Sequence, residues 1–301
     1  MSAVLGSVIK RRSTDFTDAD ILIFIWRWKV VSTSFLSIHF YGTELNQTGY
    51  RKINQLLEKK WIEKIMTPGL KTGTLFGISK LGFKLIKNDL PELRAEGYKS
   101  ETPIHDQKAS ACHYWLASLC TESEATLLTE AELRNINIDS YPEPFPKTQY
   151  HRPDGYIAIQ KQNDTKEVIA VEFERSGRSS SKYEFLDSFY TRDDWYKIDK
   201  VIWICDPMSR GQKITNEFKR IRSSVLEKSY FFSFDDLVKK DFQATTIPGT
   251  ANSVTITTVL RNNGGRVGTG LSLARFLCEM KAPFISPRYQ KMAKDQNTHC
   301  I

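Results

Sequence analysis

The stretches that decide the fold are HRPDGYIAI (residues 151–159) and VIAVEFERS (residues 168–176). Each is a short run rich in β-branched residues and bounded by turn formers. The pattern therefore predicts two strands with a hairpin-like connection at 163–166. Because side chains alternate between the two faces of a strand, Glu172 and Glu174 should project from one face. We expect Asp154, on the neighbouring strand, to join them.

Three carboxylates held close together repel one another unless a cation lies among them. Carboxylate oxygens are the ligands that hard divalent ions prefer. The sequence therefore favours a site for Mg²⁺, or Mn²⁺ in its place, at these strands. In the alternative interpretation, Glu172 and Glu174 are exposed on an edge strand and form salt bridges with Arg175 or Arg178.

The composition is that of a globular protein with room for two domains: the chain has 301 residues, 40% hydrophobic and 26% charged. The longest apolar run, 21–26, is far shorter than the roughly 18 residues of a membrane span. At the N-terminus the basic residues follow the apolar run, the reverse of a secretory signal. The five cysteines are scattered and lack zinc-site spacing. We therefore expect a cytoplasmic protein with no membrane partner.

The charge is unevenly distributed along the chain. The total is +8, of which residues 1–100 carry +7 and residues 245–301 carry +5, so that residues 101–244 carry −4. This distribution favours a module that binds a polyanion, joined to a region that gathers carboxylates. Solvated surface charge is the simpler alternative.

Residues 1–90 show the element order of a winged helix-turn-helix. Tyr50, Ile53, Leu56 and Leu57 form an apolar stripe on the third helix. The expected elements are a buried helix from Thr17 through 21–26, a helix at 35–40, a helix at 47–60, strands at 61–66 and 74–78 around a turn at 68–73, and a helix from Ser79 to 87.

The segments 55–62 and 78–82 resemble the end of the recognition helix and the exit of the wing in that superfamily. A helix of this kind fits the major groove of double-stranded DNA, and wing lysines contact phosphate. Arg51 and Lys52 have no acidic partner at i+4 on their own helix, which favours DNA over a protein partner. The predicted contact residues are Gln47, Thr48, Arg51, Lys52, Gln55, Lys59 and Lys71.

The rest of the chain divides into a linker at 91–110, a core domain at 111–244 and a basic, partly flexible tail at 245–301, with a strand expected at 254–260. The core is predicted to be a mixed sheet with helices on both faces, in the order αβββαβαβ. Its expected elements are a helix at 109–120, a strand at 125–133, the two central strands, a helix at 181–195, a buried strand at 201–205, a basic helix at 210–228 and a strand at 230–234.

This αβββαβ order, with Pro153-Asp154 followed by an acid-x-acid on the next strand, resembles the PD-(D/E)XK nuclease superfamily. The fold class implied is a restriction-endonuclease-like core behind the winged helix. The N-terminal winged helix, His113 in the first core helix and the acidic segment 129–133 before Arg152 resemble the replication-relaxation proteins of plasmids and other mobile elements. The resemblance covers about residues 18–240.

The resemblance implies roles for individual residues. Asp154 matches the first metal-binding acid and Glu172 the second. The third position is usually lysine, and here it is Glu174, a substitution that some active members share; in others the lysine lies on the next helix, where Lys182 stands. Glu132 or Glu130 matches an additional acid of several members. His113 and His151 are interpreted as a core histidine and a loop histidine.

Two functions follow from this. The first is a DNA-binding, Mg²⁺-dependent endonuclease with no small-molecule cofactor, in which Glu174 or Lys182 orients or deprotonates a metal-bound water. The second is a non-catalytic DNA-binding regulator of replication, transfer or transcription, in which the nuclease-like core is a docking domain or forms a homodimer.

Overall fold

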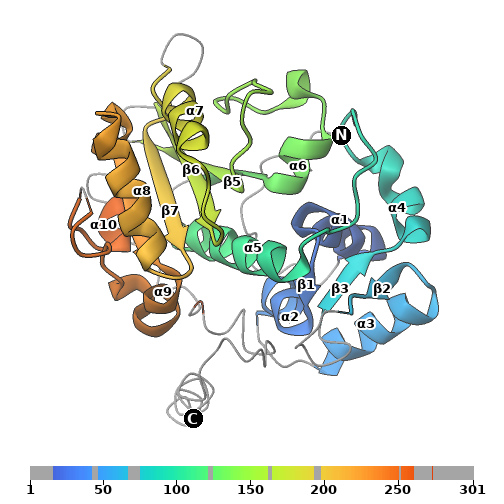
Figure 1. The fold of residues 1–301 in the computed structure, drawn as a ribbon. Helices are drawn as coiled ribbons and strands as arrows, with labels where there is room; N and C mark the ends of the chain where they lie inside the picture. The colour runs from blue at the N-terminus through green and yellow to red at the C-terminus, as the bar shows by residue number, and fades with distance from the viewer. Residues whose placement is uncertain are drawn as a thin grey trace.

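The computed structural model describes residues 16–42, 47–66, 75–120, 125–161, 165–192, 198–250, 252–260 and 273. It is a mixed α+β protein with two sheets (Figure 1). Lys71, the turn at 68–73, Trp195 and nearly all of the tail beyond 260 lie outside the described residues.

The N-terminal elements surround a three-stranded antiparallel sheet of order β1-β3-β2. Ser32 and Ser79 cap α2 and α4 with their hydroxyls, and the predicted start of a helix at Ser79 is confirmed. The bounds are α1 Asp18–Trp28, β1 Val31–Ser32, α2 Thr33–Tyr41, α3 Gln47–Glu58, β2 Ile62–Lys64, β3 Leu75–Ile78 and α4 Lys80–Ile86.

The second sheet has five strands in the order β4-β5-β6-β7-β8. Strands β4, β5 and β6 pair antiparallel, and β7 and β8 continue from β6 in parallel. The bounds are α5 Pro103–Ser118, β4 Ala125–Thr129, α6 Glu130–Asn135, β5 Gly155–Gln160, β6 Lys166–Glu174, α7 Ser180–Tyr190, β7 Lys200–Cys205, α8 Ser209–Arg220, β8 Ser229–Ser233, α9 Phe234–Lys240 and α10 Ile256–Leu260, with short 3-10 turns at Lys87–Asp89, Ile138–Ser140, Ser224–Lys228 and Asp241–Gln243.

Helices cover both faces of this sheet. On one face, Trp203 of β7 meets Tyr190 of α7 and Phe218 of α8. On the other, Phe173 of β6 meets Phe234 of α9 and a histidine of α5. The predicted helix-covered mixed sheet is therefore confirmed, and β6 is its central strand.

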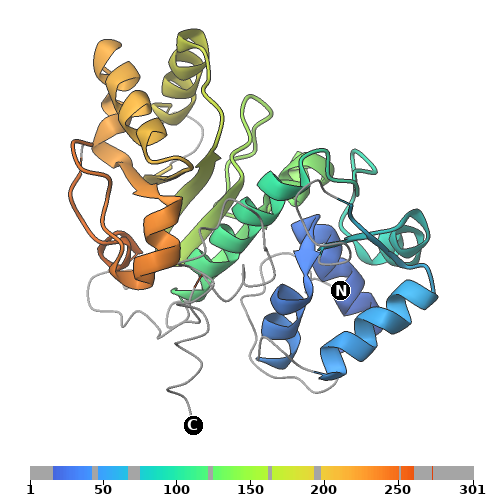
Figure 2. The ribbon, with the colours of Figure 1, turned by 60° about the horizontal axis from the view of Figure 1, so that its bottom comes forward.

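Helix α5 lies between the five-stranded sheet and the N-terminal elements in both views (Figures 1 and 2). It approaches β5 closely at Gly155, where an added Cβ would lie 2.1 Å from the ring of His113. On its other side, the Ser110 hydroxyl donates to the Trp28 carbonyl of α1. The buried His113, whose Nε2 lies 3.2 Å from the Tyr156 carbonyl, is the core histidine that the sequence predicted.

Four predicted elements are corrected by the structure. Helix α5 begins at Pro103, within the predicted linker, because proline is well suited to the first turn of a helix. The predicted strand at 125–133 ends at Thr129, where a capping box starts α6. The predicted basic helix ends at Arg220, and the predicted strand at 254–260 contains the helix α10. Short β-branched runs such as 254–260 do not distinguish helix from strand by periodicity.

Candidate functional site

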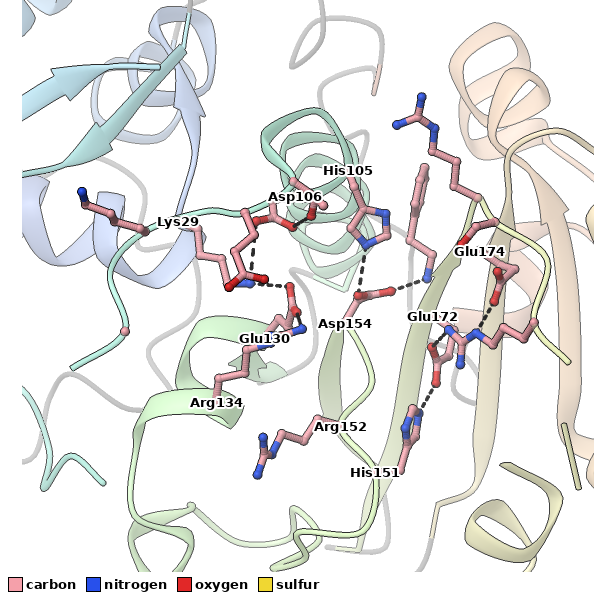
Figure 3. A pocket seen from close by; sticks show the side chains of 18 of the residues that line it. Lys29, His105, Asp106, Glu130, Arg134, His151, Arg152, Asp154, Glu172 and Glu174 are labelled. Atoms are coloured by element: carbon pink, nitrogen blue, oxygen red, sulfur yellow. Dashed lines mark hydrogen bonds and ion pairs between the residues drawn. The ribbon is translucent and has the colours of Figure 1, made fainter. Parts of the chain in front are cut away.

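The candidate site is a pocket of about 1000 Å³ at the carboxyl end of β6 (Figure 3). Its walls come from the end of α1, the start of α5, α6, the segment 151–154, the end of β6 and the loop that follows. Asp154, Glu172 and Glu174 all line it, as the strand pattern predicted. Because Glu172 and Glu174 are 1% and 2% exposed on the central strand, the interpretation as exposed edge-strand residues is wrong.

Asp154 stands directly before β5 and is held by the neighbouring strand. Its Oδ2 accepts the Phe173 amide at 2.5 Å, and its Oδ1 lies 3.6 Å from Nε2 of His105 at the start of α5. This carboxylate raises the pKa of His105, while burial of the ring acts in the opposite direction. Asp154 therefore links the sheet to α5 across the pocket.

Glu172 has the most partners of the three acids. Its Oε1 accepts the Tyr190 hydroxyl at 2.6 Å and lies 2.5 Å from Nε2 of His151, and its Oε2 accepts Nη2 of Arg178 at 3.3 Å. Burial alone raises the pKa of Glu172, but His151, Arg178 and the Tyr190 hydroxyl outweigh this effect and bring the pKa to about 2. Glu172 is therefore a fixed anion inside the protein, and His151, which lies in the loop before β5 as predicted, is its partner.

The negative charge of Glu174 has fewer stabilising partners than that of Glu172. Its Oε2 lies 2.6 Å from Nε of Arg178, an ion pair that lacks the geometry of a hydrogen bond. Burial raises the pKa of Glu174, Arg178 lowers it, and the neighbouring Glu172 and Asp154 raise it, which together bring the pKa to about 7. Near neutral pH this carboxyl is divided between its protonated and ionised forms.

Arg178 lies between the acids and pairs with both glutamates. Burial lowers its pKa, but the three carboxylates around it raise it by more, so it stays charged. The predicted salt bridge between Arg178 and these glutamates does form, but inside the pocket instead of on the surface of an edge strand. Its place inside the pocket depends on the loop after β6, which no local pattern reveals.

Lys182 and Glu132 do not reach the pocket. The Lys182 ammonium lies over the ring of Phe185 on its own helix, 4.5 Å from the centroid. The Glu132 carboxylate accepts the Thr129 amide at 2.8 Å as part of the α6 cap and forms an ion pair with Arg27 of α1 at 2.7 Å. The structure therefore places Lys182, the predicted catalytic lysine, and Glu132, a predicted metal ligand, outside this pocket.

Glu130, the other acid of that segment, does line the pocket. It pairs with Lys29, whose ammonium lies 2.9 Å from Oε2, and Lys29 also lies 3.7 Å from Asp106 of α5. Lys29 follows α1 with a positive φ of 57°, which ends that helix. The N-terminal elements thus contribute a cation directly to the wall of the pocket, as Figure 3 shows.

The predicted nucleic-acid face of α3 is largely exposed. Gln47, Thr48, Arg51, Gln55 and Lys59 are exposed, and Lys52 is half-buried.

The packing of α3 follows the predicted stripe only in part. Gly49 is buried and packs closely on α2, where a Cβ would lie 2.6 Å from the Ser37 hydroxyl. Tyr50, which was predicted to belong to the buried apolar stripe, is 41% exposed. Lys52 and Lys59 both pair with Asp18 of α1, an acidic partner that lies on another helix and so escaped the i+4 argument.

The three acids suit a hard cation, because carboxylate oxygens are the ligands that such ions prefer. In addition, the nearby positive charge does not fully stabilise the ionised form of Glu174. However, within the described part of the chain no group of three or more His, Cys, Asp or Glu side chains is arranged to hold a metal ion. The charge that an ion would supply comes from Arg178 in this arrangement. Asp154 and Glu174 fit an ion best, because Glu172 is already occupied by three partners.

Comparison of the chain with known protein families, characterised proteins and solved structures finds no match. Among the described helices, none combines the length and apolar character needed to cross a bilayer.

Proposed function

We propose that the protein binds double-stranded DNA and hydrolyses phosphodiester bonds with Mg²⁺ or Mn²⁺ in the pocket at the end of β6. The observation that carries the proposal is the meeting of Asp154, Glu172 and Glu174, from two adjacent strands, on the wall of a pocket that is also lined by seven lysines and arginines. Carboxylates bind the metal that activates water, and cations hold the phosphate.

Each group has a role in this proposal. Asp154 and Glu174 would hold the ion, which supplies a water of lowered pKa and polarises the phosphoryl oxygen. Arg178 neutralises the acids and stabilises charge on the phosphoryl oxygens. His105 lines the pocket and would act as the proton donor to the leaving oxygen.

The DNA would be recognised by the N-terminal unit as a winged helix-turn-helix. The support is the packing of α2 against α3, the antiparallel pair β2 and β3, and the exposed polar face of α3. Arg51 is the residue on which this part rests, since Lys52 and Lys59 pair with Asp18. A cytoplasmic protein of a plasmid or other mobile element, related to the replication-relaxation proteins, is the setting we propose.

A cleavage assay tests the hydrolase. Supercoiled and linear DNA are incubated with Mg²⁺ or Mn²⁺ and with wild-type protein, Asp154→Asn, Glu174→Gln or the exposed-site control Lys182→Ala. We expect nicking or cleavage by wild type and Lys182→Ala, and a loss of at least a hundredfold in the two pocket variants. Equal cleavage by wild type and Asp154→Asn would show that the activity does not come from this pocket.

A second candidate is the non-catalytic DNA-binding regulator. Arg178 favours it, because its guanidinium already pairs with both glutamates. Binding of DNA in a gel-shift assay, with no cleavage under either metal, would favour this candidate. Arg51→Ala tests the DNA-binding face for both candidates. We expect this variant to bind DNA about tenfold more weakly than wild type at moderate salt. Equal affinities of variant and wild type at every salt concentration would contradict a role of Arg51 in DNA binding.

A further inference from the structure

Arginines also gather at the part of the pocket wall formed by α6 and the segment before β5. Arg152 stands two residues before Asp154 and lines the pocket, and Arg134 of α6 lines the same side (Figure 3). Arg94 lies beside them: its Nε donates to the Arg134 carbonyl at 2.9 Å and its Nη2 to the Leu133 carbonyl at 2.8 Å. Arg94 is thereby fixed to the end of α6.

These three guanidinium groups have little negative charge among them. Arg134 forms an ion pair with Glu130 at 2.6 Å, but Glu130 also forms an ion pair with Lys29, so one carboxylate is shared by two cations. Arg152 has no ion pair with any described residue, and its Nε is buried without a hydrogen-bond partner. Arg94 and Arg134 both lie close enough to repel the charge of Arg152.

An anion would relieve both defects. It would satisfy the buried Nε–H of Arg152, whose lack of a partner costs free energy, and it would neutralise the mutual repulsion of the three groups. Guanidinium groups match phosphate oxygens in geometry and can bind them through paired hydrogen bonds. Arg152 and Arg134 line the same pocket as Asp154, so a phosphate bound at the arginines would share the pocket with the carboxylates.

We propose that Arg152, with Arg94 and Arg134, binds one backbone phosphate of DNA next to the phosphodiester held at Asp154 and Glu174. Two residues of extended chain span about 7 Å at most, which places this arginine site within reach of a neighbouring phosphate on the same strand. The site thus rests on the proposed DNA-hydrolase function and defines how the strand lies in the pocket. Free phosphate offers the same chemistry and is the competing source.

The test uses the full chain and compares Arg152→Gln with Arg220→Gln. Arg220 is an exposed arginine at the end of α8 that does not line the pocket, so this control removes the same charge elsewhere. Affinity for a DNA duplex is measured over a salt series. We expect Arg152→Gln to weaken binding at moderate salt about three- to tenfold and to reduce the slope of log affinity against log salt by about 0.9, the value for one phosphate contact. Arg220→Gln should leave the slope unchanged.

A second measurement is the melting temperature with and without inorganic phosphate, which also confirms that Arg152→Gln is folded. Phosphate should stabilise the wild type and not Arg152→Gln. An equal slope for wild type and Arg152→Gln would overturn the proposal, and stabilisation by phosphate with an equal slope would assign the site to free phosphate instead. A reduced slope for Arg152→Gln, with no DNA cleavage by wild type, would support the phosphate site and contradict only the proposed hydrolase activity.

Discussion

Glu174→Gln should change how the stability of the protein depends on pH. Burial raises the pKa of Glu174 from its ordinary 4.5 to about 7 in the folded protein. Between these two values the folded protein holds a proton that the unfolded chain has released. The contribution of this group is therefore present in full below pH 4.5 and is lost as the pH rises through 7.

The size of this loss follows from the two pKa values. Their difference corresponds to about 3 kcal/mol, which solvent screening in an open pocket reduces to about 2 kcal/mol. Glu172 acts in the opposite direction at lower pH: its pKa of about 2 means that its contribution is present above pH 4.5 and is lost as the pH falls toward 2. For these two groups together, stability should be highest near pH 4.5 and lower at pH 8.

The assay is urea unfolding of the wild type, Glu174→Gln and the exposed-site control Glu184→Gln between about pH 4.5 and 8. The wild type and the control should lose about 2 kcal/mol of unfolding free energy over this range relative to Glu174→Gln. Parallel curves for wild type and Glu174→Gln would show that the carboxyl has an ordinary pKa, and the account of its environment would be wrong.

Metal addition extends the same prediction. If Asp154 and Glu174 hold Mg²⁺, the ion competes with the proton on Glu174, so Mg²⁺ should stabilise the wild type more at pH 8 than at pH 5.5. Glu174→Gln should lose most of this difference. The same stabilisation at both pH values would place any bound Mg²⁺ away from Glu174.

Three further predictions concern the frame of the site. Arg27→Met should destabilise the protein by about 3 kcal/mol, because Glu132 remains buried without its partner, and adding Glu132→Gln should recover part of the loss in chemical unfolding. Gly155→Ala should cost about 1–3 kcal/mol through its clash with the ring of His113, and His113→Ala in the same chain should reduce that additional cost. Lys182→Ala should leave cleavage rates within twofold of wild type, since the side chain lies outside the pocket; a large loss would return a catalytic role to it.

The features predicted well from the sequence are those that a short segment determines. The acid-x-acid pattern placed Glu172 and Glu174 on one face of a strand, and the uniformly apolar run at 201–205 indicated a buried parallel strand. The hydroxyl cap at Ser79 is local too, because the hydroxyl accepts the amide of Gly82, only three residues later.

The features that the sequence did not predict depend on partners far along the chain. His105 was assigned to the linker, and its role follows only when α5 brings it to Asp154. Lys52 looked unpaired because its partner Asp18 stands 34 positions earlier, on α1. The Pro103 start of α5 was the one available signal for His105, since proline favours the first turn of a helix and would have placed His105 on the core helix.

Burying the charged groups of the pocket costs folding stability, and a purely structural domain gains nothing in return. This cost bears on the choice between the hydrolase and the regulator. A buried ion pair seldom contributes more stability than apolar residues of similar volume. Here, the central strand carries two buried glutamates, and one of them is so poorly compensated that its pKa is about 7. Such perturbed groups in a cleft are typical of sites that bind or transform a ligand. A docking domain has no need of a carboxyl such as Glu174, whereas a bound metal ion does, and this is why the Mg²⁺ dependence of stability at Glu174 bears on the choice between the hydrolase and the regulator.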